Sequence, residues 1–408
     1  MIDKSTVRAV NAMTARWARA SLAGGEGGTV FASPGAWPLI GLLAGAADGP
    51  ARSEMETALG VPADEAIRRS GDLLSALGGM TGVDSALGLW TRDDKLTLRP
   101  EWQAMLPAAV HGTLTGDHDA DHAVLDDWAH ARTEGLIPAM RVELVDDTRL
   151  VLASALLLRT TWLRPFYDVW SGTEDGPWAG RDLTVLCRRT AVPDRLRVVR
   201  TPAGPLTVVE VVGDDGLSVH LVLGEEDAAP GDVLAAGTEA VGGAWPGRPG
   251  SRLPPGEAGP GVEVSLRRSE VREDRLSLQV AQFTVEAEHD LLQMPQVFGL
   301  DAATDNRTGH FPGVAEEPLA VGSAAQNATA TFGPLGFKAA AVTDFGGVAA
   351  GVPAEPKRPH VVRHIDARFL RPFGFLAVHR ASRLVLAAGW VTEPDEYDLA
   401  AEFGEDES

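Results

Sequence analysis

The chain has 408 residues, of which 44% are hydrophobic, and its 57 acidic against 36 basic side chains give a net charge of −21. This length and apolar content support a large buried core, in one large fold or in several domains. The negative charge disfavours binding to nucleic-acid phosphates or to anionic lipid surfaces, and solubility alone is enough to explain it.

The start of the chain lacks a basic segment followed by an apolar one, so we expect no signal peptide. No apolar run approaches the length of a transmembrane helix. The single cysteine, Cys187, excludes an intramolecular disulfide framework and suits a reducing compartment. Abundant Gly, Pro, Ala and Arg are typical of a high-GC genome, and we expect a protein of bacterial type. Because no signal peptide is expected, we also expect it to be cytoplasmic.

Helices are predicted for the first third of the chain. Val7, Val10, Met13 and Trp17 recur at helical spacing within residues 4–22. Ser33 is the expected N-cap of a helix that is apolar all round and therefore buried. Further helices are predicted at residues 64–77, 100–109 and 121–133.

Strands dominate the prediction from residue 149 onward. Residues 150–158 contain a single polar side chain, Ser154, which is typical of a central strand covered on both faces. Strands at 195–200, 206–213 and 217–223 precede a helix near 230–240, and a hairpin turned by Ala381 and Ser382 comes late in the chain. Helices first and strands later, with little alternation, predict an α+β fold with mostly antiparallel sheets.

Two segments have the composition of loops. Residues 243–262 are rich in Gly and Pro and predict a mobile insertion. The acidic tail, residues 395–408, predicts a disordered terminus.

Local motifs give no support for catalysis. The chain has no GxSxG, GxGxxG, Walker or HExxH sequence. A His/Asp cluster offers metal ligands, but an acidic helix N-terminus produces the same pattern; its members are Asp117, His118, Asp119, Asp121 and His122. Cys187 is flanked by arginine and is either an activated thiol or a plain strand cysteine. We therefore predict no catalytic residue, no metal and no cofactor.

The stretch "GFKAAAVTDFGGVAAG", residues 336–351, reads as a strand followed by an exposed proline-spaced loop. Alternation places Phe337, Ala339, Ala341 and Thr343 on one apolar or β-branched face, whereas the other face is mixed. Alanines lose little side-chain entropy on burial, as a strand that joins a sheet late requires. An ordinary edge strand leading into a long loop is the alternative interpretation.

Several segments, in this order, resemble the serpin family. They are "VFASPGAWPLIGLLAGAADG", residues 125–166 with Trp128 and Thr161-Trp162, "VAQFTVEAEHDL", and the C-terminal hairpin at residues 369–394. The resemblance extends from about residue 5 to residue 394. It implies one domain, residues 1–394, with three β-sheets, eight or nine helices and an exposed reactive loop at residues 337–365.

In that family a protease attacks the reactive loop, whose N-terminal part then inserts into the main sheet and traps the acylated protease. The resemblance implies a loop hinge formed by Gly336, Phe337, Lys338, Ala339, Ala340, Ala341, Val342 and Thr343. Counting from Gly336 puts the scissile bond between Ala350 and Gly351, which suits elastase-like or subtilisin-like serine proteases. The resemblance to the serpin family also implies that Trp162, Ser154 and Gln326 lie at the points where the main sheet opens.

The chain departs from the family pattern at the hinge and beneath the sheet. Phe337 stands where a small Thr is usual, which predicts slow or blocked insertion. The polar residues beneath the sheet appear here as Ala36, Leu39, Ser154 and Gln326, which predicts lost hydrogen bonds.

We expect a monomeric inhibitor of a serine protease that acts as a suicide substrate. The alternatives are a non-inhibitory binding or assembly protein with this fold and, third, an enzyme that reuses the scaffold in a biosynthetic pathway.

Overall fold

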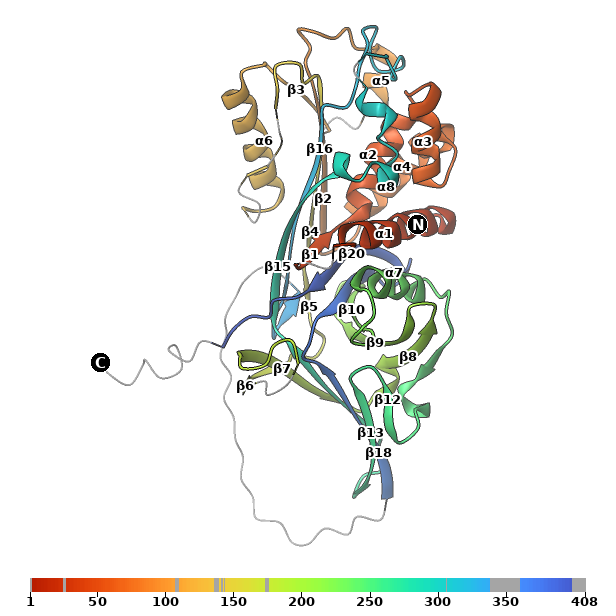
Figure 1. Ribbon diagram of the computed structural model, residues 1–408, viewed down its shortest axis with the longest axis vertical. Helices are drawn as coiled ribbons and strands as arrows, with labels where there is room; N and C mark the ends of the chain where they lie inside the picture. The colour runs from red at the N-terminus through yellow and green to blue at the C-terminus, as the bar shows by residue number, and fades with distance from the viewer. Residues whose placement is uncertain are drawn as a thin grey trace, which may run out of the picture.

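The computed structural model describes residues 2–24, 27–106, 110–135, 139–140, 142, 144–172, 176–305, 307–337 and 360–397. The helices are α1 (Lys4–Ser21), α2 (Ser33–Ala44), α3 (Gly49–Leu59), α4 (Ala63–Gly78), α5 (Pro100–Met105), α6 (His118–Arg132), α7 (Pro230–Val241) and α8 (Pro295–Phe298). Most lie at one end of the elongated molecule, and strands β13 and β18 lie at the other (Figure 1). None of the helices in these ranges is long and apolar enough to cross a membrane.

The longest sheet, here named the β4–β16 sheet, runs between α6 on one face and α2 on the other (Figure 1). In order, its strands are β3 (His111–Thr113), β2 (Val83–Thr91), β4 (Leu150–Leu158), β16 (Ser323–Phe332), β17 (Gly336–Phe337) and β5 (Thr160–Thr161), and β15 (Phe283–Asp290) pairs with β16. The predicted central strand at residues 150–158 is β4, and only Leu156 within it is not fully buried.

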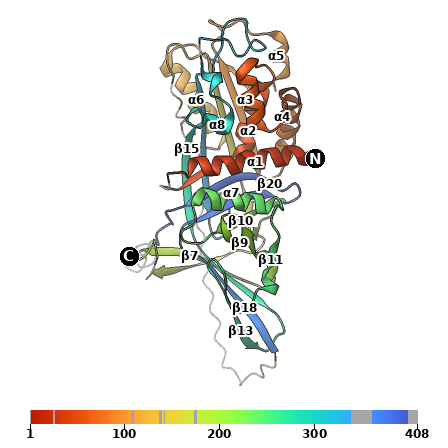
Figure 2. The ribbon, with the colours of Figure 1, turned by 45° about the vertical axis from the view of Figure 1, so that its right-hand side comes forward.

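The second sheet, the β19–β20 sheet, forms the centre of the molecule and is covered by α1 and α7 (Figure 2). Its order is β1 (Thr29–Phe31), β20 (Leu384–Val391), β19 (Phe373–His379), β10 (Leu217–Leu223), β9 (Gly204–Val212), β8 (Leu196–Thr201) and β11 (Gly247–Pro249). The predicted late hairpin is β19 with β20, which pair antiparallel.

The third sheet, the β13–β18 sheet, extends toward the far end of the molecule (Figure 1). Its order is β12 (Gly256–Gly259), β13 (Val262–Ser269), β18 (His360–Phe369), β14 (Arg275–Ala281), β7 (Asp182–Thr190) and β6 (Tyr167–Gly172).

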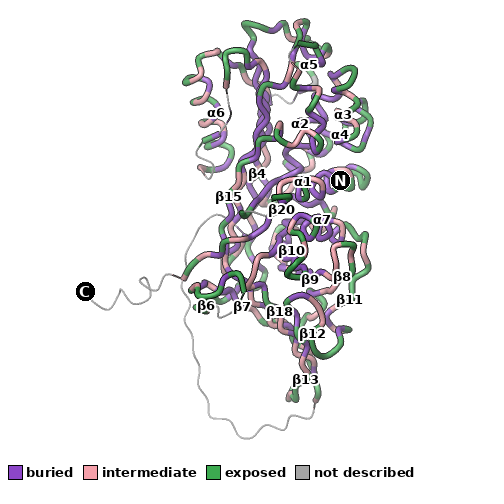
Figure 3. The backbone as a smooth tube through the Cα atoms, in the orientation of Figure 1, coloured by how far each residue is buried: buried purple, intermediate pink, exposed green. Residues whose placement is uncertain are grey.

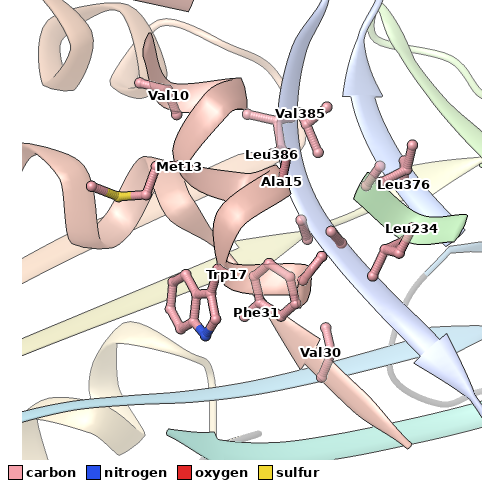
Figure 4. Packing of buried hydrophobic residues seen from close by; sticks show 14 of the residues in the cluster. Val10, Met13, Ala15, Trp17, Val30, Phe31, Leu234, Leu376, Val385 and Leu386 are labelled. Atoms are coloured by element: carbon pink, nitrogen blue, oxygen red, sulfur yellow. The ribbon is translucent and has the colours of Figure 1, made fainter. Parts of the chain in front are cut away.

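The core is continuous from α1 into the β19–β20 sheet (Figures 3 and 4). The inward face of α1 carries the predicted apolar residues, and Trp17 stacks on Phe31 of β1 with ring centroids 4.7 Å apart. Val385 and Leu386 of β20 lie beside this helix (Figure 4). Burying such large side chains contributes about 1.5–3 kcal/mol each, so this packing fixes the sheet against α1.

Three details differ from the predictions. Helix α2 begins at Ser33 itself, Ala32 occupies the N-cap position, and the Ser33 hydroxyl is buried without a hydrogen-bond partner. Residues 243–262 form β11 and β12, both paired with neighbouring strands, and they bury Leu253. This segment is therefore part of the folded body, in contrast to the predicted insertion.

The chain end also differs. The tail was predicted to be disordered from residue 395, but Asp395 accepts hydrogen bonds from the backbone N–H of Thr184 and of Thr284, and Glu396 bridges to Leu183. Residues 398–408 lie outside the described part of the chain.

Candidate functional site at the junction of β4, β16 and β17

Strands β4 and β16 are parallel neighbours, but they pair over a short length only. Residues 323–326 of β16 pair with residues 151–154 of β4. Beyond this point, residues 327–331 pair only with β15 and residues 155–158 pair only with β2, within the part of the chain that the structure describes. The two strands therefore enclose a stretch, here named the slot, in which each has a ladder partner on one side alone.

The closed end of the slot is held by Gln326. Its side-chain Nε2 donates to the Ser154 hydroxyl at 2.8 Å and to the Ala32 carbonyl at 3.0 Å, and its Oε1 accepts from the Ala32 N–H at 2.7 Å. Gln326 is 2% exposed and Ser154 is 1% exposed, so each lost bond would leave a buried polar group unpaired. One amide thus serves three groups, whereas Ala36 and Leu39 carry no polar side-chain atom, as expected for a loss of hydrogen bonds at those two positions.

Close packing of α2 against β4 supports this network. A Cβ atom at Gly35 would lie 2.8 Å from the Ser154 hydroxyl oxygen, so glycine is required for the helix to approach the strand. Ala36 and Leu39 on the same helix are fully buried. The closed end is therefore fixed both by hydrogen bonds and by packing.

The open end of the slot contains β17. Phe337 is antiparallel to both neighbours, paired with Phe332 of β16 and with Thr160 of β5, and Gly336 pairs with Thr161. Trp162, predicted to lie at this end, donates from its indole N–H to the Gly333 carbonyl at 2.9 Å. Its ring packs on Phe332 with centroids 4.9 Å apart.

Phe337 is accommodated rather than excluded. Its side chain is 4% exposed, and its ring lies 5.9 Å, centroid to centroid, from that of Phe375 in the β19–β20 sheet. The sheet holds the Phe337 ring on its core side, and slow or blocked insertion of the residues that follow stays a prediction. Phe337, the first residue of the predicted apolar face, thus points toward the core, as that prediction requires.

An arginine lies beside the open end. Arg188 of β7 stacks over the Phe166 ring at 4.4 Å and donates to the Arg164 carbonyl at 3.0 Å. Burial, together with the like charges of Arg164 and Arg195, lowers the pKa of Arg188 to about 10. The guanidinium remains charged at neutral pH, and its contacts with Arg164 and Phe166 hold the segment that follows Trp162 in place.

The rest of the predicted loop is only partly described. Lys338, Ala339, Ala340, Ala341, Val342, Thr343, Ala350 and Gly351 lie outside the described residues. The predicted loop end at residue 365 is too late, because residues 360–365 already belong to strand β18.

The His/Asp cluster orders a helix terminus. Asp117 caps α6 by accepting from the Ala120 N–H, and Asp121 accepts from the N–H groups of Thr115 and Gly116. Among the described residues, no group of three or more His, Cys, Asp or Glu side chains is placed to hold a metal.

Cys187 and the sequon asparagine Asn327 are both structural. Cys187 is a buried residue of β7, and burial raises the pKa of its thiol, which favours the plain strand cysteine over the activated thiol. Asn327, the first residue of the glycosylation sequon Asn-Ala-Thr, is 7% exposed and donates to the Ala139 carbonyl. Asn306, the first residue of the other such sequon, Asn-Arg-Thr, lies outside the described residues.

Comparison with known proteins identifies the fold. A family model described as serpin (serine protease inhibitor) matches residues 8–176, and no curated protein matches the sequence. Human thyroxine-binding globulin complexed with its hormone has a TM-score of 0.72 at 16% identity, covering 96% of this chain and 99% of that chain. Serpin48 of the insect Tenebrio molitor has a TM-score of 0.69 at 17% identity, covering 97% and 100%.

A serpin from the trematode Schistosoma haematobium has a TM-score of 0.67 at 15% identity, covering 96% of this chain and 100% of that chain. The chain therefore has the serpin fold over nearly its whole length, and the matched part, residues 8–176, is serpin-like in sequence as well. The comparisons indicate no enzyme family.

Proposed function

We propose that this protein inhibits a serine protease as a suicide substrate, with the segment after β17 entering the slot once the loop is cut. The observation that carries this proposal is the position of β17. It lies between β16 and β5, antiparallel to both, and the strand from Gly336 to Phe337 runs toward the slot.

The register supports a strand of defined length. If the pairing of β17 continued, residues 338–342 would face residues 331–327 of β16 on one side and residues 159–155 on the other. Thr343 would then meet Gln326 and Ser154, which are paired with each other. Insertion as far as residue 342 needs no existing pair to break, and further insertion requires the closed end to separate.

The energy of such a step is large. New ladder hydrogen bonds would satisfy unpaired strand edges, and burial of apolar area contributes about 25 cal/mol per Å². For eight or more residues this is on the order of ten kcal/mol, enough to drive a one-way change.

Target and setting follow from the loop sequence and composition. A scissile bond between Ala350 and Gly351 suits an elastase-like or subtilisin-like protease, because both flanking residues are small. We further propose a monomer in a bacterial cytoplasm, in keeping with the single, buried, free thiol.

The test is incubation with pancreatic elastase or subtilisin, followed by denaturing gel electrophoresis. We expect a covalent complex that survives SDS. Ala341→Asp places a charge on the core-facing side and should yield cleaved protein without complex, whereas Ala340→Asp, on the other side, should still form complex. Cleavage of the natural sequence without any complex or inhibition would contradict the proposal.

A second candidate is a binding protein with this fold that does not inhibit. The four paired positions at the closed end and the Gln326 network favour it, because they hold the sheet together. Thyroxine-binding globulin, one of the structures with the same fold, is a complex with its hormone. A loop that is cut without any rise in thermal stability would support this candidate.

A further inference from the structure

A groove of about 560 Å³ lies beside the outer edge of the β19–β20 sheet, under the Gly/Pro-rich segment. Its apolar wall includes Val198, Leu253 and Ala258, and its charged residues are Arg200, Arg248 and Glu257. The volume is within the range of about 300–1,000 Å³ that is usual for small-molecule sites.

Pairing of β11 with β8 places the two arginines on one face. Arg248 is directly opposite Val198 in the antiparallel ladder, and Arg200 follows Val198 by two positions on the same strand. Directly opposite residues and residues two apart share a face of a sheet. The guanidinium groups therefore flank the same apolar floor.

The far wall is fixed by close contacts of β12. A Cβ atom at Gly259 would lie 2.8 Å from the Val198 side chain, so the backbone crosses the sheet at a distance that only glycine allows. The Thr207 hydroxyl donates to the Pro260 carbonyl at 2.7 Å, and Ser251 N–H donates to Asp194 at 2.9 Å. The groove is thus a built feature of the fold.

The arginines of the groove are not neutralised. Arg200 and Arg248 are exposed, and neither has an ion pair with any described carboxylate. Arg195, close by in sequence, is bound by Glu210. In a chain with net charge −21, two free guanidinium groups against one carboxylate give this groove a local positive charge.

We propose that the groove binds a small amphipathic anion. A carboxylate or sulfate head lies on Arg200 and Arg248, whose planar guanidinium groups bind such oxyanions through paired hydrogen bonds. The apolar part of the molecule covers Val198, Leu253 and Ala258. Glu257 opposes the negative head and limits the affinity.

The test is isothermal titration of the full chain with four ten-carbon probes. Decanoate and decyl sulfate should bind with one-to-one saturation, whereas decanol and decyltrimethylammonium should not. The double variant Arg200→Gln/Arg248→Gln should weaken decanoate binding by about tenfold or more. Arg8→Gln removes an exposed charge from α1 and is the matched control, which should bind as the natural protein does.

Two further variants separate charge from shape. Ala258→Trp fills the groove without changing its charge and should abolish binding, and Glu257→Gln should strengthen it by about twofold or more. Urea unfolding of each variant verifies that the fold is retained. The proposal is wrong if decanoate shows no saturable binding below about 1 mM, or if Arg8→Gln weakens it as much as the double variant does.

Discussion

The two strands on either side of residues 338–359, β17 and β18, are held very differently. On the N-terminal side, β17 has 2 residues, paired with Phe332, Thr160 and Thr161. On the C-terminal side, β18 has 10 residues, of which eight pair with β13 and six with β14. The first strand ends at a slot with unpaired edges, whereas the second is enclosed on both sides. We therefore expect that only β17, here named the N-terminal anchor, can lengthen, because the residues after it can pair with strand edges in the slot.

The largest expected effect is that of cutting the loop. If the segment after β17 inserts, a nick within residues 338–359 should raise the melting temperature by roughly 10 °C, which corresponds to about ten kcal/mol for a chain of this length. Calorimetry of nicked and intact protein measures it. Ala341→Asp should remove the rise and Ala340→Asp should keep it. An unchanged melting temperature in the nicked natural protein would mean that the segment after β17 does not insert.

Acid should weaken the β4–β16 sheet, which contains β17, and the neighbouring β19–β20 sheet. Burial lowers the pKa of His289 in β15 and of His220 in β10 to about 4, below the unfolded value of about 6.5. Between these values the unfolded chain binds more protons, so the free energy of unfolding falls as the pH decreases from 6.5 to 4, by about 3 kcal/mol for each histidine.

Urea midpoints at pH 7.5, 6 and 5 measure this dependence. His289→Gln should remove about half of it, and His130→Gln, on the exposed side of α6, should leave it intact. If the urea midpoint depended on pH equally in the natural protein and in His289→Gln, the pKa of His289 in β15, the outer neighbour of the slot, would not be lowered as described.

Removing the Phe337 ring tests how much β17 contributes to the free energy of unfolding. Phe337→Ala should lower the free energy of unfolding by about 3 kcal/mol, because a buried aromatic side chain is lost from between two strands. Val361→Ala, on the enclosed strand β18 but 62% exposed, should change it by less than about 0.5 kcal/mol. Comparable losses in urea unfolding would remove the contrast between the two sites.

The closed end of the slot should show the smallest equilibrium effect and a clear kinetic one. Gln326→Ala leaves Ala32 and Ser154 without their partner and should lower the free energy of unfolding by about 2 kcal/mol. After nicking, the melting temperature of this variant should also rise faster than that of the natural protein, because β4 and β16 separate more easily at the closed end of the slot. Gln103→Ala, exposed on α5, is the control; slower insertion in Gln326→Ala would contradict this role.

Much of this architecture could be predicted from local patterns. The helical spacing of Val10 and Trp17, the apolar run of β4 and the alternation that begins at Phe337 each depend on neighbours a few residues away. Burial on one face or on both faces imposes a period on the sequence, and that period can be recognised without knowing the partner. The resemblance of ordered segments then indicated the fold.

Other features were decided by the tertiary structure. The amide of Gln326 bonds to Ser154, 172 positions away in sequence, and no local pattern indicates that one glutamine replaces several polar groups. The composition of the Gly/Pro-rich segment is that of a loop and predicts a mobile insertion, yet pairing with β8 and β13 makes the segment the wall of a groove.

The same distinction applies to the site. The sequence by itself determined which face of the segment after Gly336 is apolar, because alternation is a property of the backbone. Only the tertiary structure decided that Phe337 already lies between β16 and β5. It also decided that the five residues 327–331 of β16, between Gln326 and Phe332, pair with β15 but have no described partner on the side of the slot. Strand partners and register depend on contacts between distant parts of the chain, which are formed only when the whole core packs.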